Sequence, residues 1–199
     1  MKRIFFLSIF FFFVGCSSSM LSLSPNREDE MRGLYVALDE YTDATMNHQV
    51  DKLMTFVYPK VFSLISEDKM VSLLNRLYSS GKAPKIIGIE HKYISDIQVY
   101  EGGVYSLIIS DMYMELVSPA TNSPEHELFY YMLLKKRMGS NSTVNFDRKR
   151  HLYRVKKESK IIAIKEKNQG WKFVGCEQAK KYASRDIIPK QIAMLLSSI

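Results

Sequence analysis

The stretch that decides the fold is IIAIKEKNQGWKFVGC, which occupies residues 161–176. Runs of β-branched, aromatic and other apolar residues at 160–167 and 171–176 predict two strands. The turn residues Asn168-Gln169-Gly170 lie between them and predict a tight connection. The stretch therefore predicts an antiparallel hairpin near the end of the chain.

The sequence before this hairpin also alternates with a period of two. Apolar and polar residues alternate from 87 to 99, and a second long strand is expected over 104–117. Glu101-Gly102-Gly103 predicts the turn between them. A further strand is expected over 144–157, so that five strands follow one another through the second half of the chain.

Helices are expected before, between and after the strands along the sequence. Apolar residues recurring at three and four positions predict a first helix of about twenty residues, capped by Ser24 or Asn26. The other expected helices cover 50–58, 66–81, 126–138 and 190–196. A run of helices followed by hairpin-linked strands predicts an α+β fold with an antiparallel sheet, here with a helical insertion and a C-terminal helix.

This order of elements resembles the nuclear transport factor 2-like, or ketosteroid isomerase-like, cone fold. The resemblance covers roughly residues 27–177, and Gly170-Trp171-Lys172-Phe173-Val174 is similar to the start of the family's last strand. It implies N-terminal helices packed in the concave side of a strongly curved antiparallel sheet, a cone or half-barrel with an apolar pocket. The insertion at 121–141 and the C-terminal helix depart from the minimal family pattern.

Members of this family include isomerases, dehydratases and cyclases, and many others only bind ligands or proteins, so the fold does not fix a function. The Asp and Tyr residues of ketosteroid isomerase cannot be aligned onto this sequence. No catalytic set is therefore placed by the resemblance.

Five residues on the expected strands are candidates for pocket chemistry. His91 and Tyr93 are expected on one face of the first strand. Asp111 and Tyr113 share a face of the second, and Tyr153 lies with Val155 on the apolar face of the third. If these faces all line the cone, the cluster supplies a general base and hydrogen-bond donors. The alternative is that they are packed core residues whose polar tips are satisfied.

The N-terminus predicts export and lipid attachment. Lys2 and Arg3 precede an apolar run of eleven residues, 4–14, interrupted only by Ser8. As a helix this run would span about 16 Å, too short for a hydrocarbon core of about 30 Å and typical of a signal peptide. Phe13-Val14-Gly15-Cys16 resembles the bacterial lipobox, in which the Cys is acylated and becomes the first residue. The alternative is a buried N-terminal helix with an incidental Cys16.

The lipobox resemblance sets the expected organisation and location. Residues 1–15 are the signal peptide, 16–25 a lipid-anchored Ser-rich tether and 26–199 a single domain. Ser17, in place of Asp, implies the outer membrane by the sorting rule of enteric bacteria. The protein is thus expected in the cell envelope, facing the periplasm and held by its lipid at Cys16.

The formal charge of +7 is distributed unevenly. Residues 17–134 carry 9 Lys and Arg against 16 Asp and Glu, whereas residues 135–199 carry 17 against 5. A basic stripe is expected on one strand face, formed by Arg148, Arg150, Arg154 and Lys156. It is either a solvated face partly paired with acidic helices or a contact for anionic lipid or another anionic partner. Nucleic acid is not expected as a partner of an exported protein.

No cofactor is expected, and no metal site, because the four His residues are scattered. The function expected from the sequence is a non-enzymatic module that binds an apolar small molecule or an envelope protein. The alternative is a pocket enzyme of isomerase or hydratase type that uses the Asp/His/Tyr cluster. A homodimer formed through the sheet is a further alternative for its assembly.

Overall fold

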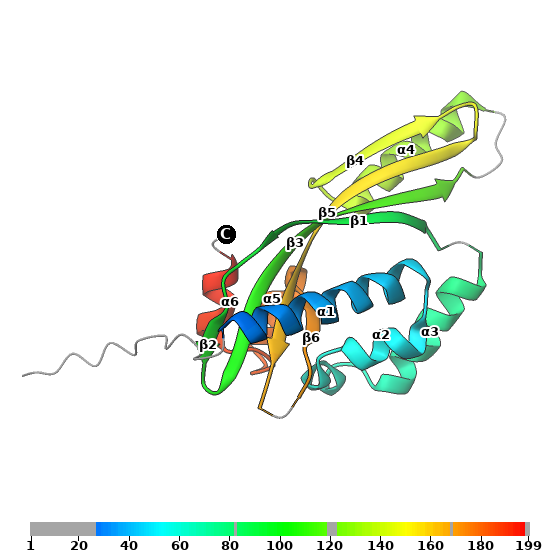
Figure 1. Cartoon of the computed structure of the whole chain (residues 1–199). Helices are drawn as coiled ribbons and strands as arrows, with labels where there is room; N and C mark the ends of the chain where they lie inside the picture. Colours follow the sequence, from blue (N-terminus) through cyan, green and yellow to red (C-terminus); the bar gives the residue numbers. More distant parts are fainter. Residues whose placement is uncertain (1–26, 82, 119–122, 168, 198–199) are drawn as a thin grey trace, which may run out of the picture.

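The computed structural model describes residues 27–81, 83–118, 123–167 and 169–197 (Figure 1). The expected signal peptide, Cys16 and the tether lie outside these residues. The described chain is α+β, with six α-helices and an open, curved antiparallel sheet of six strands. The fold class, the helical insertion and the C-terminal helix are confirmed. None of the described helices is long and apolar enough to cross a bilayer.

The helices share the positions expected from the sequence, with small differences at their ends. The second one stops earlier than expected because Tyr58 takes an extended backbone before Pro59, where a short 3₁₀ helix begins. Two short turns of helix after residue 175 were not expected. The bounds are α1 (Arg27–Met46), α2 (Val50–Phe56), η1 (Pro59–Ser63), α3 (Glu67–Ser79), α4 (Pro124–Met138), η2 (Cys176–Gln178), α5 (Ala179–Ala183) and α6 (Lys190–Ser197).

Two long strands form the centre of the sheet, and each pairs along its outer edge with two shorter strands. The strands are β1 (Lys85–Ile94), β2 (Gln98–Tyr100), β3 (Gly103–Val117), β4 (Ser142–Asp147), β5 (Leu152–Lys165) and β6 (Lys172–Gly175). β3 pairs with β5 over its whole length and carries β1 and β2 on its other edge. β4 and β6 pair with opposite ends of β5. The expected closing hairpin is therefore formed by β5 and β6.

The expected strand at 144–157 is wrong, because the chain turns at 148–151. The Asp147 carboxylate accepts hydrogen bonds from the backbone N–H groups of Lys149 and Arg150, at 3.1 and 3.2 Å, and His151 adopts a left-handed φ of 50°. The break expected near 158–159 is also wrong. Glu158 and Ser159 pair with Asp111 and Ser110, so β5 runs through this point without interruption.

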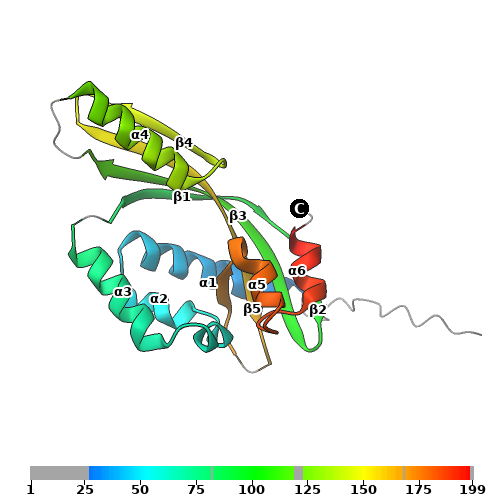
Figure 2. The same ribbon diagram turned by 180° about the vertical axis from the view of Figure 1, so that it is seen from behind.

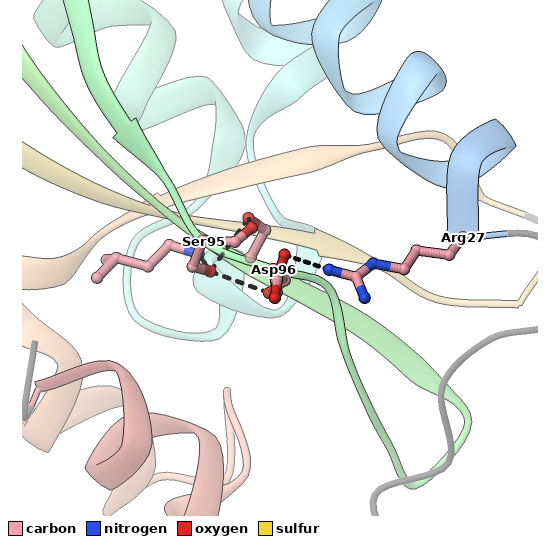
Figure 3. Close-up of polar contacts among 5 residues, drawn as sticks. Arg27, Ser95 and Asp96 are labelled. Carbon is pink, nitrogen blue, oxygen red and sulfur yellow. Dashed lines mark hydrogen bonds and ion pairs between the residues drawn. The ribbon is translucent and has the colours of Figure 1, made fainter.

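The first expected strand is divided into β1 and β2 by residues 95–97. There the buried Ser95 and Ser106 replace regular pairing: Ser106 Oγ donates to the Ser95 carbonyl at 2.8 Å, and Ser95 Oγ accepts from Leu107 N–H at 2.9 Å. Figure 3 shows Arg27, at the start of α1, paired with Asp96 beside this break. The ion pair at this break therefore links the start of α1 to the sheet.

The twist of the two long strands divides the molecule into two ends. Even-numbered residues of β3 meet α1 at one end, where Ile108 packs with Leu34, and meet α4 at the other, where Met114 packs with Leu134. Both helices therefore cover the same side of β3. Because long paired strands twist, this side faces different directions at the two ends, and α4 lies well apart from α1 in Figures 1 and 2.

Three buried clusters follow from this arrangement. α1 and α2 pack on β3, β5 and β6 around Leu38, Ile108 and Phe173. α5 and α6 cover the opposite face around Leu107 and Ile188. The third cluster joins α4, β4 and residues 152–157 of β5, which together we name the α4 lobe. This lobe projects away from α1, α2 and α3 (Figure 2).

Candidate functional site

His91 lies between α1 and the sheet. Its Nε2 is 3.1 Å from Thr42 Oγ1 and its Nδ1 is 2.8 Å from Ser110 Oγ. Burial lowers the pKa of His91, with Asp39 opposing the shift. Both ring nitrogens thus have structural partners, so the ring bridges two layers of the fold.

The expectation that His91 and Tyr93 share a face is wrong. β1 has a β-bulge between them: His91 pairs with Ser110, whereas Tyr93 pairs with Ile109. One extra residue reverses the alternation of side chains. Tyr93 therefore turns to the other side of the sheet and is 44 % exposed.

Asp111 and Tyr113 share a face, as expected, but it is the face opposite His91 and Ser110. Asp111 Oδ2 lies 2.9 Å from Lys156 Nζ and 3.5 Å from Lys92 Nζ. The hydrogen bond from Lys156 lowers the pKa of Asp111 despite partial desolvation. Tyr113 donates to Glu90 at 3.1 Å. Asp111 is therefore held as a paired carboxylate, which is the opposite of what a general base near neutral pH requires.

Tyr153 occupies a third location, inside the α4 lobe. It is 1 % exposed, and its hydroxyl donates to the Glu127 carbonyl at 3.1 Å. The rings of Tyr130 and Phe146 lie 5.3 and 4.6 Å from it, centroid to centroid. Burial raises its pKa. The five candidates are thus distributed over separate surfaces, and the structure does not bring them together as a cluster.

The expected basic stripe is divided between a turn and a strand. Arg148 and Arg150 lie in the β4–β5 turn and not on a strand, which corrects the expectation of a single strand face. Arg154 Nε lies 3.4 Å from Glu115, and Lys156 pairs with Asp111. The strand cations are therefore neutralised, whereas no ion pair of the described residues involves the turn cations.

A polar cluster that the sequence did not indicate lies near the end of β5. Glu166 accepts hydrogen bonds from Tyr58 Oη at 2.6 Å and from Lys60 Nζ at 2.7 Å. Burial and the bond to Glu166 raise the pKa of Tyr58 to about 12. The bonds from Lys60 and Tyr58 lower the pKa of Glu166. Each group already has a partner, so the cluster joins η1 to β5.

An open, partly apolar groove lies between α1, α2 and the turn before β6. We name it the α1 groove; its volume is about 610 Å³, within the range of small-molecule sites. Phe56 and Trp171 line it beside Val36, which is 56 % exposed. The groove also contains charged residues of both signs, namely Asp29, Arg32, Glu40 and Lys172.

The indole of Trp171 packs directly on the backbone of α1. A Cβ at Gly33 would lie 3.4 Å from Trp171 Nε1, in van der Waals contact with the ring, so the indole approaches the helix backbone closely at this point. This Nε1–H is buried and has no hydrogen-bond partner among the described residues. A glycine on the inner side of the first helix and the Gly170-Trp171 pair were the only sequence signals of this groove.

Cys176 and the possible metal ligands complete the set of candidate groups in the described part of the chain. Burial raises the pKa of the Cys176 thiol, which disfavours the nucleophilic thiolate. Among the described residues, no group of three or more His, Cys, Asp and Glu side chains could hold a metal ion.

In comparisons with known proteins, no family model, no curated protein and no solved structure matches the chain.

Proposed function

We propose that this chain is a lipid-anchored protein of the bacterial cell envelope and acts as a non-enzymatic binding module. The observation that carries the binding role is the α1 groove, whose walls are formed by Phe56, Trp171 and the exposed Val36. The envelope location rests on the lipobox-like Phe13-Val14-Gly15-Cys16. The family resemblance, in which many members only bind, supports the same function.

The chemistry of the α1 groove favours a ligand with an apolar body. Its inner part offers aromatic and aliphatic side chains, and removing apolar ligand surface from water at such a site favours binding. The surrounding charges of both signs, including Arg32 and Glu40, suit a polar end group or a peptide backbone. We therefore propose an apolar small molecule or an apolar segment of an envelope protein as the ligand.

The geometry gives less support to the isomerase or hydratase alternative. That reaction needs a base and hydrogen-bond donors that converge on one substrate. Here His91 is bonded to Thr42 and Ser110, Asp111 is paired with Lys156 on the other face, and Tyr153 is inside the α4 lobe.

The groove can be tested through its own fluorophore, because Trp171 is the only tryptophan of the chain. The apolar dye 1-anilinonaphthalene-8-sulfonate is added, and energy transfer from Trp171 to the dye is measured. Energy transfer is expected in the native chain. The affinity for the dye, obtained from its titration, is expected to be at least tenfold lower in Val36→Asp. Tyr35→Asp is the matched control: Tyr35 is 49 % exposed on the same helix but does not line the groove.

Equal dye binding by the two variants would contradict the groove as the binding site. Native mass spectrometry of the protein extracted from the envelope then tests for a bound molecule. Its loss in Val36→Asp and its retention in Tyr35→Asp would identify the natural ligand.

A further inference from the structure

The outward side of α4 carries large apolar side chains that the fold does not use. Leu128, Phe129 and Met132 are 60, 67 and 63 % exposed. Their spacing of one and four residues places them on one side of the helix. The opposite side already supplies the contact with β4 and β5, where Leu134 is 4 % exposed. α4 is therefore apolar on both sides, although only one of them packs on the protein.

Cations lie at one end of this apolar side. Lys135 and Lys136 follow Met132 by three and four residues, on the same side of α4, and both are exposed. Arg137 completes the last turn. Cations in a last turn also complement the helix dipole, but that effect does not account for the apolar residues beside them.

A second group of cations lies near the other end of α4. Arg148, Lys149 and Arg150 are exposed in the β4–β5 turn. Tyr153, just beyond this turn, donates to the Glu127 carbonyl in the first turns of α4. No ion pair among the described residues involves these six cations. The acidic residues of the same end are Glu125, Glu127 and Asp147, and the Asp147 carboxylate is occupied by the backbone of the turn and by Arg154. The apolar side of α4 thus has exposed cations near both of its ends.

This combination matches the interface of an anionic bilayer. Apolar side chains of an interfacial helix enter the boundary between head groups and acyl chains, while Lys and Arg contact anionic head groups. Single exposed apolar residues are normal on a protein surface, but three adjacent ones flanked by cations mark an interaction surface. An antiparallel second copy of α4 would pair Lys135 and Lys136 with Glu125 and Glu127, but it would leave Arg148, Lys149 and Arg150 of the β4–β5 turn without a use. These additional cations favour an anionic lipid surface, and a dimer is an outcome that the test distinguishes.

We propose that the α4 lobe docks on an anionic lipid bilayer through Leu128, Phe129 and Met132, with Lys135, Lys136 and the cations of the β4–β5 turn contacting the head groups. This inference goes beyond the α1 groove and uses the envelope location in the proposed function. Residues 17–26 between Cys16 and α1 can span at most about 35 Å, at 3.3–3.6 Å per residue. The lobe would then be a second contact that holds the domain against the membrane carrying its lipid.

The test uses residues 16–199 with Cys16→Ser, so that neither a signal peptide nor a lipid contributes. All described core residues lie between Leu34 and Ala193, so this chain retains the whole core. Co-sedimentation is measured with vesicles of phosphatidylcholine alone and of phosphatidylcholine mixed with phosphatidylglycerol. Binding is expected only to the mixed vesicles and is expected to weaken as salt is added.

Two variants separate the apolar and charged contributions. Phe129→Ser is expected to weaken binding to the mixed vesicles at least tenfold, because its side chain no longer enters the bilayer. Lys135→Gln with Lys136→Gln is expected to weaken it about 25-fold, at about fivefold for each lysine. The matched controls lie on α3: Leu77→Ser, where Leu77 is 44 % exposed, and Lys69→Gln with Arg76→Gln.

Four outcomes would overturn the inference. They are equal binding to both vesicle types, no binding to either, equal losses in the α3 controls, and a dimer that Phe129→Ser converts to a monomer without any vesicle binding. Unchanged thermal unfolding of each variant shows that a loss is not caused by misfolding. Failure of the dye test at the α1 groove, or of lipid attachment at Cys16, would leave these vesicle results unchanged, so the proposals fail separately.

Discussion

Glu166 joins two distant parts of the chain through two hydrogen bonds, and this gives a pH-dependent stability. Its partners Tyr58 and Lys60 lower its pKa in the folded protein. The stabilisation is therefore full above the unfolded pKa, near 4.3, and is lost as the pH falls through the lower folded pKa.

Glu166→Gln is expected to lower the free energy of unfolding at pH 7 by about 1 kcal/mol, a small value because Lys60 is half-exposed. It is also expected to reduce the difference in stability between pH 7 and pH 3. Urea unfolding at both pH values checks this. Glu177→Gln, which removes the same charge from an exposed pair with Lys157, serves as the control. A pH profile identical to that of the native chain would contradict the role of Glu166.

The titration of His91 predicts a second loss of stability, at a higher pH than that of Glu166. Burial between Thr42 and Ser110 lowers its folded pKa, so below about pH 6.5 the unfolded chain takes up a proton that the folded chain resists. Stability is therefore lost as the pH falls through and below the unfolded pKa, about 6.5. His91→Gln is expected to remove this part of the loss, whereas His126→Gln on the exposed side of α4 is expected to retain it. Chemical unfolding followed across this pH range decides between the two results.

At the scale of elements, the β4–β5 turn has no glycine, and its geometry depends on Asp147 and His151. The left-handed backbone of His151 costs an L-residue about 1–2 kcal/mol. His151→Gly is expected to raise the free energy of unfolding by up to about 1 kcal/mol and His151→Val to lower it by about 1–2 kcal/mol. Lys149→Gly is the control, because Lys149 is outside that backbone region. Thermal unfolding is expected to rank His151→Gly as the most stable, the Lys149→Gly control in between and His151→Val as the least stable.

The same turn explains where sequence and structure differ. Helices such as α1 could be predicted from the sequence because their apolar period and acidic first turn are local. The β4–β5 turn lacks Gly, Pro and Asn, and it forms because the Asp147 carboxylate caps backbone N–H groups. The bulge after His91 likewise depends on pairing with β3, which no local pattern reveals. A one-residue shift was sufficient to separate the expected His91 and Tyr93 pair.

At the scale of the whole molecule, the two proposed binding surfaces, the α1 groove and the α4 lobe, lie apart. The twist of β3 and β5 places the α1 groove and the α4 lobe at different ends of one sheet. The groove is formed largely by the acidic helical half of the chain, whereas the lobe contains most of the clustered cations. The net charge of +7 therefore does not describe either surface: the groove carries charges of both signs, whereas the cations gather on the lobe.

Lipid attachment decides whether these two surfaces work at a membrane, and the two cysteines allow a matched test in the full chain. In cells, the native protein is expected to begin at Cys16 and to carry the mass of its acyl chains. Cys16→Ser is expected to begin at Met1 without acyl groups, because lipid attachment precedes cleavage in the family that the lipobox resembles. Cys176→Ser is expected to match the native mass and processing.

Intact mass must be the readout for this test, because an uncleaved apolar run at 4–14 would itself hold Cys16→Ser in the membrane fraction. A native chain without acyl mass would contradict the anchor. If the anchor is present, the lipid-anchored Phe129→Ser variant is expected to stay in the membrane fraction. Its α4 backbone amides are expected to exchange hydrogen faster than those of the native chain. That result would show that lipid and lobe act as two separate membrane contacts, the lipid giving attachment and the lobe giving orientation.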